Sequence, residues 1–131
     1  MNQTWRPLAV ISAIGFIGFF IWIIIIADMG EGSLWWSFID RIPYGDKFGH
    51  LGLVSTLSFL CNLAFARRES GRVSRTTWII FVILTLEELS QGFSPHRHLD
   101  VFDWLADLAG LAVGQYSARL IRLKSRETTA P

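Results

Sequence analysis

The sequence is poor in charged residues and in cysteine. Asp, Glu, Lys and Arg make up 18% of the 131 residues, whereas a soluble domain usually contains about a quarter. Cys61 is the single cysteine, so an intrachain disulfide is excluded. It stands in an apolar run without a neighbouring base, and we predict that it packs in the interior rather than acting as a nucleophile. No internal repeat is present, and the net charge of +1 points to no class of partner.

The sequence is rich in apolar residues. They make up 51% of the chain, the mean hydropathy is +0.38, and there are six Trp and ten Phe. Leu8 to Ala27 is a run of twenty residues without a charge, enough to cross about 30 Å of hydrocarbon. Arg6 precedes it as in a signal peptide, but a signal peptide has an apolar core of about 7–15 residues that ends in small residues. We therefore predict an uncleaved spanning helix.

Three further helices are expected, which makes the protein an all-α, polytopic membrane protein with four transmembrane helices in a single domain. The predicted helices cover about residues 8–27, 47–66, 76–93 and 100–123. The last two carry carboxylates and lack eighteen uncharged residues in a row. An alternative is therefore two spanning helices and two amphipathic helices that lie on the membrane surface.

The positions of the carboxylates favour four spanning helices. Glu87 and Glu88 lie near the end of the third helix and Asp103 near the start of the fourth, so an antiparallel hairpin brings them together. The fourth helix also contains Gly110 and Gly114, a spacing that lets two helix backbones approach closely in lipid. We expect tight packing along this face.

The basic residues give the predicted orientation. Nine of the twelve fall on one side of a four-helix arrangement and three on the other. Because basic residues are enriched in cytoplasmic loops, both termini are expected in the cytoplasm, with the 28–46 loop and the 94–100 turn outside. The nine are Arg6, Arg67, Arg68, Arg72, Arg75, Arg119, Arg122, Lys124 and Arg126, and the three are Arg41, Lys47 and Arg97.

Ionisable and polar residues then gather at the outward-facing end of the bundle. Asp46 and His50 are four residues apart and share a helix face, with Lys47 beside them. Gln91 lies one turn beyond Glu87 and Glu88. Asp103, Asp107, Gly110 and Gly114 follow one stripe of the fourth helix, so the face of closest approach also carries acids.

Such residues at membrane depth cost about 2.5–3.5 kcal/mol each, and they usually face a bundle interior or a wet cavity. A structural explanation is that the acids neutralise Lys47 and Arg97 and cap helix ends, with Asp100 and Asp103 at the positive end of the fourth helix. Two adjacent glutamates and a histidine exceed that need, which favours a polar pocket. His96 and His98 flank Arg97 and are predicted to be solvated rather than metal ligands.

The motifs resemble the VanZ-like family, small bacterial membrane proteins named after an accessory factor in teicoplanin resistance. The resemblance runs from about Asp46 to Gly114 and rests on the spacing of Asp46-Lys47-x-x-His50, Glu88-x-x-Gln91, Pro95-x-Arg97 and Asp103-x-x-x-Asp107-x-x-Gly110-x-x-x-Gly114. It implies a bacterial cytoplasmic (inner) membrane protein of the cell envelope, with a link to antibiotic resistance, but supplies no reaction. The residues of interest that it implies are Asp46, Lys47, His50, Glu88, Gln91, Arg97, Asp103 and Asp107. Glu87 is added from its position alone, and Asp107 departs from the asparagine that is usual in the family.

Three classes of function are compatible with these residues. In the first, the pocket binds or processes a phosphorylated lipid or cell-wall precursor. Lys47 and Arg97 then hold the anionic headgroup, and His50 and Glu88 are the acid–base candidates. Whether the protein is an enzyme is left open, and so are its substrate and oligomeric state. No cofactor or metal is expected, because no paired histidine or cysteine motif is present, although a metal held by His50 and carboxylates is a variant of this hypothesis.

The second class is a non-catalytic membrane partner or assembly factor, in which the polar residues only lock the helices together. The third is a small transporter or proton relay. It is disfavoured because the inner halves of the helices offer few polar residues beyond Ser58, Asn62 and Thr85. The expected partners are membrane lipids and no nucleic acid, since the basic loop at Arg67–Arg75 is short and faces anionic lipid.

Overall fold

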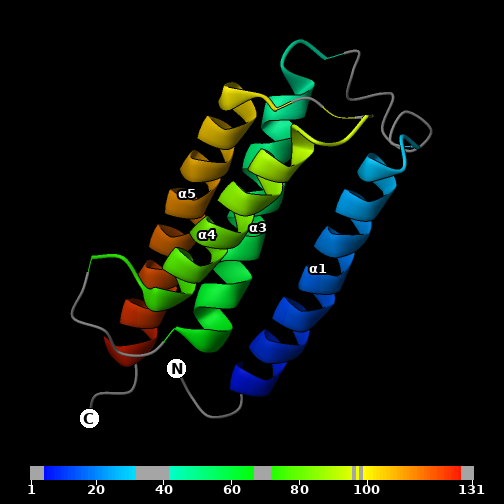
Figure 1. The fold of residues 1–131 in the computed structure, drawn as a ribbon. Coiled ribbons are helices and arrows are strands. Elements are labelled where there is room, and N and C mark those ends of the chain that lie inside the picture. The colour runs from blue at the N-terminus through cyan, green and yellow to red at the C-terminus, as the bar shows by residue number, and fades with distance from the viewer. Residues whose placement is uncertain (1–4, 32–41, 67–71, 96, 98, 128–131) are drawn as a thin grey trace.

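A computed structural model describes residues 5–31, 42–66, 72–95, 97 and 99–127 of the chain. These residues form four α-helices and no strand. The helices alternate in direction, so that α1 and α4 end at the same end of the bundle at which α3 and α5 begin (Figure 1). The four helices are α1 (Trp5–Asp28), α3 (Gly45–Phe65), α4 (Arg75–Gln91) and α5 (Val101–Glu127). The all-helical prediction is confirmed, with helix ends that differ from the predicted ones by up to four residues.

Local sequence explains where α4 begins and ends. The Ser74 side chain accepts a hydrogen bond from the Thr77 N–H at 3.1 Å, which satisfies one of the unpaired N–H groups at the start of the helix. At the other end, the N–H groups of Gly92, Phe93 and Ser94 bond to carbonyls three residues back. This tightened turn ends the helix at Gln91, before Pro95.

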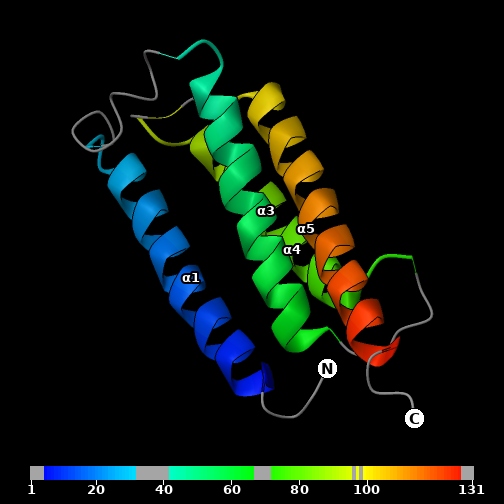
Figure 2. The same ribbon diagram turned by 180° about the vertical axis from the view of Figure 1, so that it is seen from behind.

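α3 is the central helix of the bundle. It packs most extensively against α5 and also against α1, while α4 packs more lightly against α5 and α3 (Figures 1 and 2). The glycine pair lies in the main interface: a Cβ added at Gly110 would meet Leu51 O at 2.9 Å and Ser55 N at 3.0 Å. The close approach predicted for these glycines is therefore made with α3, not with the hairpin partner α4.

The bundle has a narrow core and an apolar outer surface. Buried residues of all four helices meet at the centre, among them Ala13, Cys61, Leu84 and Leu111, which confirms that Cys61 is a packing residue. Many large apolar side chains face outward instead, and of the residues of α1 only Ala13 is buried. Among the described helices, α1 and α3 are long and apolar enough to cross a membrane.

A polar network holds the bundle together at the end opposite the ionisable residues. The Asn62 amide donates to Ser58 O at 2.8 Å and to Thr77 Oγ1 at 2.9 Å, and its oxygen accepts from Ser74 Oγ. Gln115 Oε1 accepts from the Ser74 N–H at 2.9 Å. Ser58 and Asn62, two of the few polar residues in the inner halves of the helices, thus connect α3 to α5 and α4.

Candidate functional site

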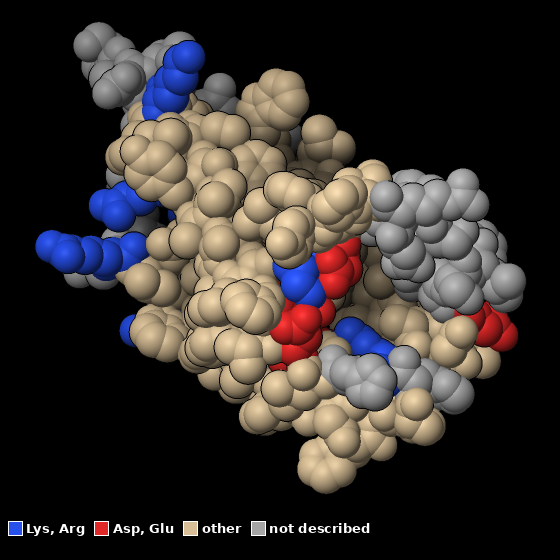
Figure 3. All heavy atoms as spheres, turned by 90° about the horizontal axis from the view of Figure 1, so that it is seen from above, with Lys and Arg blue, Asp and Glu red and all other residues tan. Residues whose placement is uncertain are grey.

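The polar residues singled out in the sequence meet at one end of the bundle. Seen from above this end, acidic and basic side chains lie beside one another between the helix ends (Figure 3). All nine predicted site residues lie here, and Asp28 and Asp100 join them through direct contacts. We call these eleven residues the polar cluster: Asp28, Asp46, Lys47, His50, Glu87, Glu88, Gln91, Arg97, Asp100, Asp103 and Asp107. His96 and His98 lie outside the described residues.

Lys47 stands at the centre of three carboxylates. Its Nζ lies 2.7 Å from Asp46 Oδ2, 2.7 Å from Asp100 Oδ2 and 2.7 Å from Asp103 Oδ1. The ammonium lowers the pKa of the Asp100 carboxyl below its ordinary value of 3.8, chiefly through their hydrogen bond. The three carboxylates are close enough together to ligate a cation, but the side chain of Lys47 already supplies the positive charge.

His50 is oriented by a buried carboxylate on another helix. Its Nδ1 lies 3.0 Å from Oδ1 of Asp107, which is 2% exposed. A carboxylate at Nδ1 favours the tautomer with the proton on that nitrogen, which leaves the lone pair on Nε2. The Nε2 atom lies 4.0 Å from Asp103 Oδ2, beyond direct hydrogen-bonding distance. The predicted acid stripe of α5 thus faces the histidine of α3.

Glu88 joins the end of α4 to the start of α5. Its Oε1 accepts a hydrogen bond from the Asp100 N–H at 3.0 Å, and its Oε2 accepts from Gln91 Nε2 at 2.9 Å. Glu88 and Gln91 are each 3% exposed. Both oxygens of this buried carboxylate therefore have partners, and one of them satisfies a backbone N–H at the beginning of α5.

Arg97 connects α4 to α1. Its Nη1 lies 2.6 Å from Glu87 Oε1 and 3.3 Å from Asp28 Oδ1, at the last residue of α1. Gln91 Nε2 also donates to Glu87 Oε2 at 3.1 Å. The nine predicted site residues lie on or beside the second, third and fourth predicted helices, and none lies on the first. The contact of Asp28 with Arg97 shows that α1 also reaches the polar cluster.

The polar cluster has an excess of negative charge. It contains seven carboxyl side chains, of Asp28, Asp46, Glu87, Glu88, Asp100, Asp103 and Asp107, and two permanent cations, Lys47 and Arg97. Asp46 and Asp28 are half exposed at its rim, whereas Glu88 and Asp107 are buried. In chemical terms, the polar cluster offers an oriented imidazole, a guanidinium and several hydrogen-bond acceptors. The ammonium of Lys47 is enclosed by carboxylates.

Helices long and apolar enough to cross a bilayer, with ionisable residues gathered at one end of the bundle, suggest a small helical membrane protein. A family model supports this: that of VanZ/LLP1 matches residues 3–122, nearly the whole chain. The chain belongs to the VanZ/LLP1 family. No curated protein and no solved structure matches it.

Proposed function

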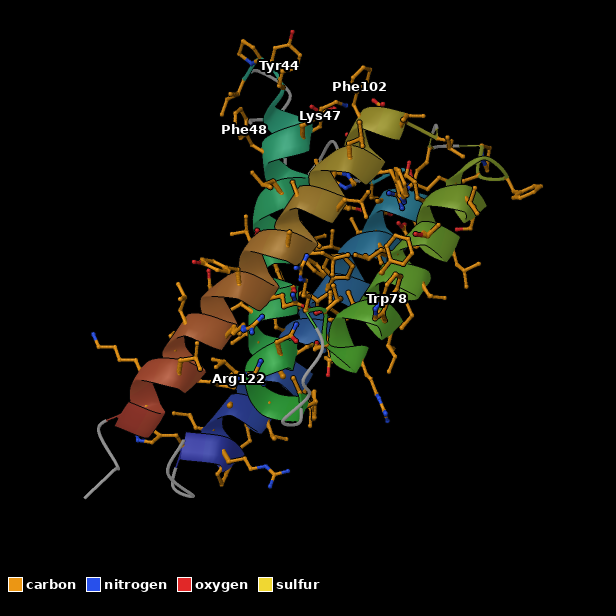
Figure 4. The ribbon with its side chains drawn as sticks, turned by 90° about the vertical axis from the view of Figure 1, so that its left-hand side faces the viewer. Tyr44, Lys47, Phe48, Trp78, Phe102 and Arg122 are labelled. Atoms are coloured by element: carbon orange, nitrogen blue, oxygen red, sulfur yellow. The ribbon has the colours of Figure 1, made fainter. Side chains whose placement is uncertain are left out.

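We propose that the protein is a multi-pass protein of the bacterial cytoplasmic membrane, with four spanning helices, both termini in the cytoplasm and the polar cluster at the outer surface. The distribution of basic residues supports this orientation. Aromatic side chains support the position of the polar cluster at the membrane surface, where such residues are enriched. Tyr44, Phe48 and Phe102 are well exposed and lie around Lys47 at this end (Figure 4). Trp78, in the first turn of α4, lies farther from this end (Figure 4).

At this surface, we propose, the polar cluster binds and processes a phosphorylated lipid or cell-wall precursor. The pairing of His50 with Asp107 carries the proposal. A histidine held through Nδ1 by a buried carboxylate presents Nε2 as a general base, and the carboxylate stabilises the imidazolium that forms on proton transfer. Family membership adds a proposed link to glycopeptide resistance.

Arg97 is the group proposed to hold the phosphate. A guanidinium has five N–H donors in a planar fork that matches two phosphate oxygens. Among the described residues, Glu87 and Asp28 contact it, both at Nη1. Donors on Nε and Nη2 are therefore proposed for the headgroup. Lys47, the second anion-binding residue expected from the sequence, is enclosed by carboxylates, and we propose that it holds the cluster together instead.

A second candidate function is that of an assembly factor whose polar cluster is structural. The observation that favours it is Glu88, whose two oxygens both bond within the chain, one of them to the backbone of α5. In this case the cluster locks α4 and α5 together and takes no ligand. Glu88, an acid–base candidate in the sequence, has this role of joining helices under both proposals.

Parallel substitutions separate the two candidates. His50→Ala, Arg97→Ala and Glu88→Gln are compared for membrane abundance and for the level of glycopeptide resistance that the protein confers. If the cluster is a site, His50→Ala and Arg97→Ala accumulate normally and lose resistance. If it is a structural lock, all three proteins are degraded.

The lipids that co-purify with the protein identify the ligand. Native mass spectrometry of wild type and Arg97→Ala is expected to show one phosphorylated lipid that is enriched only in the wild type. Identical lipid profiles in the two proteins would contradict binding of an anionic headgroup at Arg97.

A further inference from the structure

The imidazole of His50 and the carboxylate of Asp103 are held at a separation that one oxygen atom can bridge. His50 Nε2 and Asp103 Oδ2 are 4.0 Å apart, which is too far for a direct hydrogen bond. If an oxygen atom lies about 2.8 Å from both atoms, the angle that they form at this oxygen is roughly 90°. This is close to the angle between the two O–H bonds of water. Both groups can therefore contact the same small hydroxylic molecule.

The contacts of both groups leave each with a hydrogen-bond acceptor when the imidazole is neutral. Asp107 engages Nδ1 of His50, which leaves the lone pair on Nε2. Lys47 engages Oδ1 of Asp103 at 2.7 Å, which turns the other oxygen, Oδ2, towards His50. Two acceptor atoms can both bind the same oxygen atom only if that oxygen carries two O–H donors. Water has two, whereas the hydroxyl of an alcohol has one.

We propose that His50 and Asp103 together hold and activate a water molecule, so that the polar cluster hydrolyses the phosphate ester or anhydride of a membrane lipid. This rests on the proposed binding of a phosphorylated lipid. Nε2 of His50 takes one proton of the water while the water oxygen attacks phosphorus. The bond from phosphorus to the leaving oxygen breaks, and that oxygen takes the proton back from Nε2. The products are inorganic phosphate, or a phosphorylated fragment, and the lipid with one phosphoryl group fewer.

In this mechanism Asp103 is a catalytic residue, because it contacts the attacking water. Its neighbour Asp100 makes the matched control. Each carboxylate lies 2.7 Å from Lys47 Nζ, but among the described residues Asp103 alone of the two lies within 4.0 Å of the His50 ring nitrogens. A loss of activity common to both variants would reflect the contact with Lys47, and a loss confined to Asp103 reflects the water.

The test measures phosphate release by the full-length protein in nanodiscs that contain diacylglycerol phosphate or a polyprenyl diphosphate, in water enriched in ¹⁸O. The wild type is expected to release phosphate that carries one ¹⁸O atom. Asp103→Asn and His50→Ala should each lose at least about 100-fold, in the range found for a general acid or base. Asp100→Asn should lose clearly less than Asp103→Asn, and Arg119→Met, which changes an exposed residue of α5 away from the polar cluster, should keep the activity of wild type. Equal losses in Asp103→Asn and Asp100→Asn would overturn the assignment of Asp103.

Further outcomes separate this inference from the proposed function. Lipid binding that depends on Arg97, without phosphate release by the wild type, would overturn hydrolysis and leave the binding proposal standing. Loss of binding itself would contradict both. A readout that needs no activity is the ¹⁵N spectrum of His50: a proton on Nδ1 in the neutral ring is expected, and one on Nε2 would overturn the role as base. Activity abolished by a chelator and restored by a divalent cation would replace the proposed arrangement with a metal-bound water.

Discussion

The guanidinium of Arg97 lies 3.3 Å from the carboxylate of Asp28, although the two residues are 69 positions apart in the chain. Asp28 is the last residue of α1, and Arg97 follows α4. The contact extends the polar cluster to all four helices. It also gives Arg97 two acidic partners that differ in exposure: the side chain of Asp28 is 50% exposed and that of Glu87 is 15% exposed.

This difference predicts unequal effects of removing the two charges. Asp28→Asn should lower the free energy of unfolding by about 0–1 kcal/mol, as for exposed ion pairs. Glu87→Gln should cost more, about 1–3 kcal/mol, because it leaves the largely buried guanidinium without its nearer partner. Thermal unfolding of the purified proteins in one detergent measures both. A larger effect of Asp28→Asn would show that the α1 contact dominates.

The glycine pair of α5 predicts that the stability of the bundle depends strongly on the size of the side chain at these two positions. A Cβ at Gly114 would meet Phe59 N at 2.7 Å and Ser58 Cβ at 2.7 Å, and these atoms cannot move without shifting α3. Gly114→Ala should therefore destabilise the bundle by about 1–3 kcal/mol, as overpacking of a core does. Gly110→Ala should cost less, because its closest contacts are longer.

Gly52 is the matched control for this prediction. It lies in α3, and no heavy atom comes within 4 Å of a Cβ added there. Gly52→Ala should leave stability unchanged or raise it by up to about 1 kcal/mol through helix propensity. Equal unfolding temperatures for Gly114→Ala and Gly52→Ala would contradict the close packing of α3 on α5.

Removing the Lys47 ammonium should remove the part of the pH dependence of stability that comes from Asp100. Lys47 lowers the pKa of Asp100, so this pair stabilises the wild type above about pH 4, and the contribution is lost as the pH falls through the lowered pKa. In Lys47→Met this contribution is absent at every pH. The deficit of the variant, about 1–3 kcal/mol at pH 7, should shrink on acidification.

Unfolding temperatures between pH 7 and pH 3.5 test this expectation. Arg119→Met, which removes an exposed charge from α5 away from the polar cluster, serves as the control. A deficit of Lys47→Met that stays constant over this range would show that the carboxylates do not depend on the ammonium.

Four spanning helices predict that Phe93 and Arg72, which flank α4, lie on opposite sides of the membrane. Phe93→Cys, at a position that is 92% exposed, should react with a membrane-impermeant maleimide in intact cells. Arg72→Cys should react only after the membrane is opened, and Cys61→Ser removes the native thiol from both proteins. Labelling of both cysteines from the same side would support the alternative in which α4 lies on the membrane surface.

The helices and the gathering of polar residues could be predicted because each depends on sequence patterns that one element carries alone. The run from Leu8 to Ala27 is apolar throughout, and the stripe of Asp103, Asp107 and Gly110 follows from helix geometry. An antiparallel order of helices then brings the acids together. These inferences required no knowledge of which helices touch.

Which helices pack against each other could not be predicted in the same way. α1 is apolar on every side and buries only Ala13, so its sequence does not mark the face that meets α3. The contact of Asp28 with Arg97 follows from that packing. Likewise, Gly110 and Gly114 indicate that another helix packs closely against them, but they do not identify that helix. Ser55 and Phe59 of α3 carry no sequence pattern that marks them as the facing residues.

The pairing of α3 with α5 has a consequence for how the chain is made. The hydroxyl of Ser58 donates to Leu111 O at 2.9 Å across 53 positions of sequence, so the central helix obtains its main partner only when the last helix has left the ribosome. Until then Ser58 lacks the acceptor that α5 provides, whereas the partners of Asn62, Ser74 and Thr77, have already been made. A nascent chain that stops before α5 therefore leaves the Ser58 hydroxyl without the acceptor that Leu111 supplies in the complete chain.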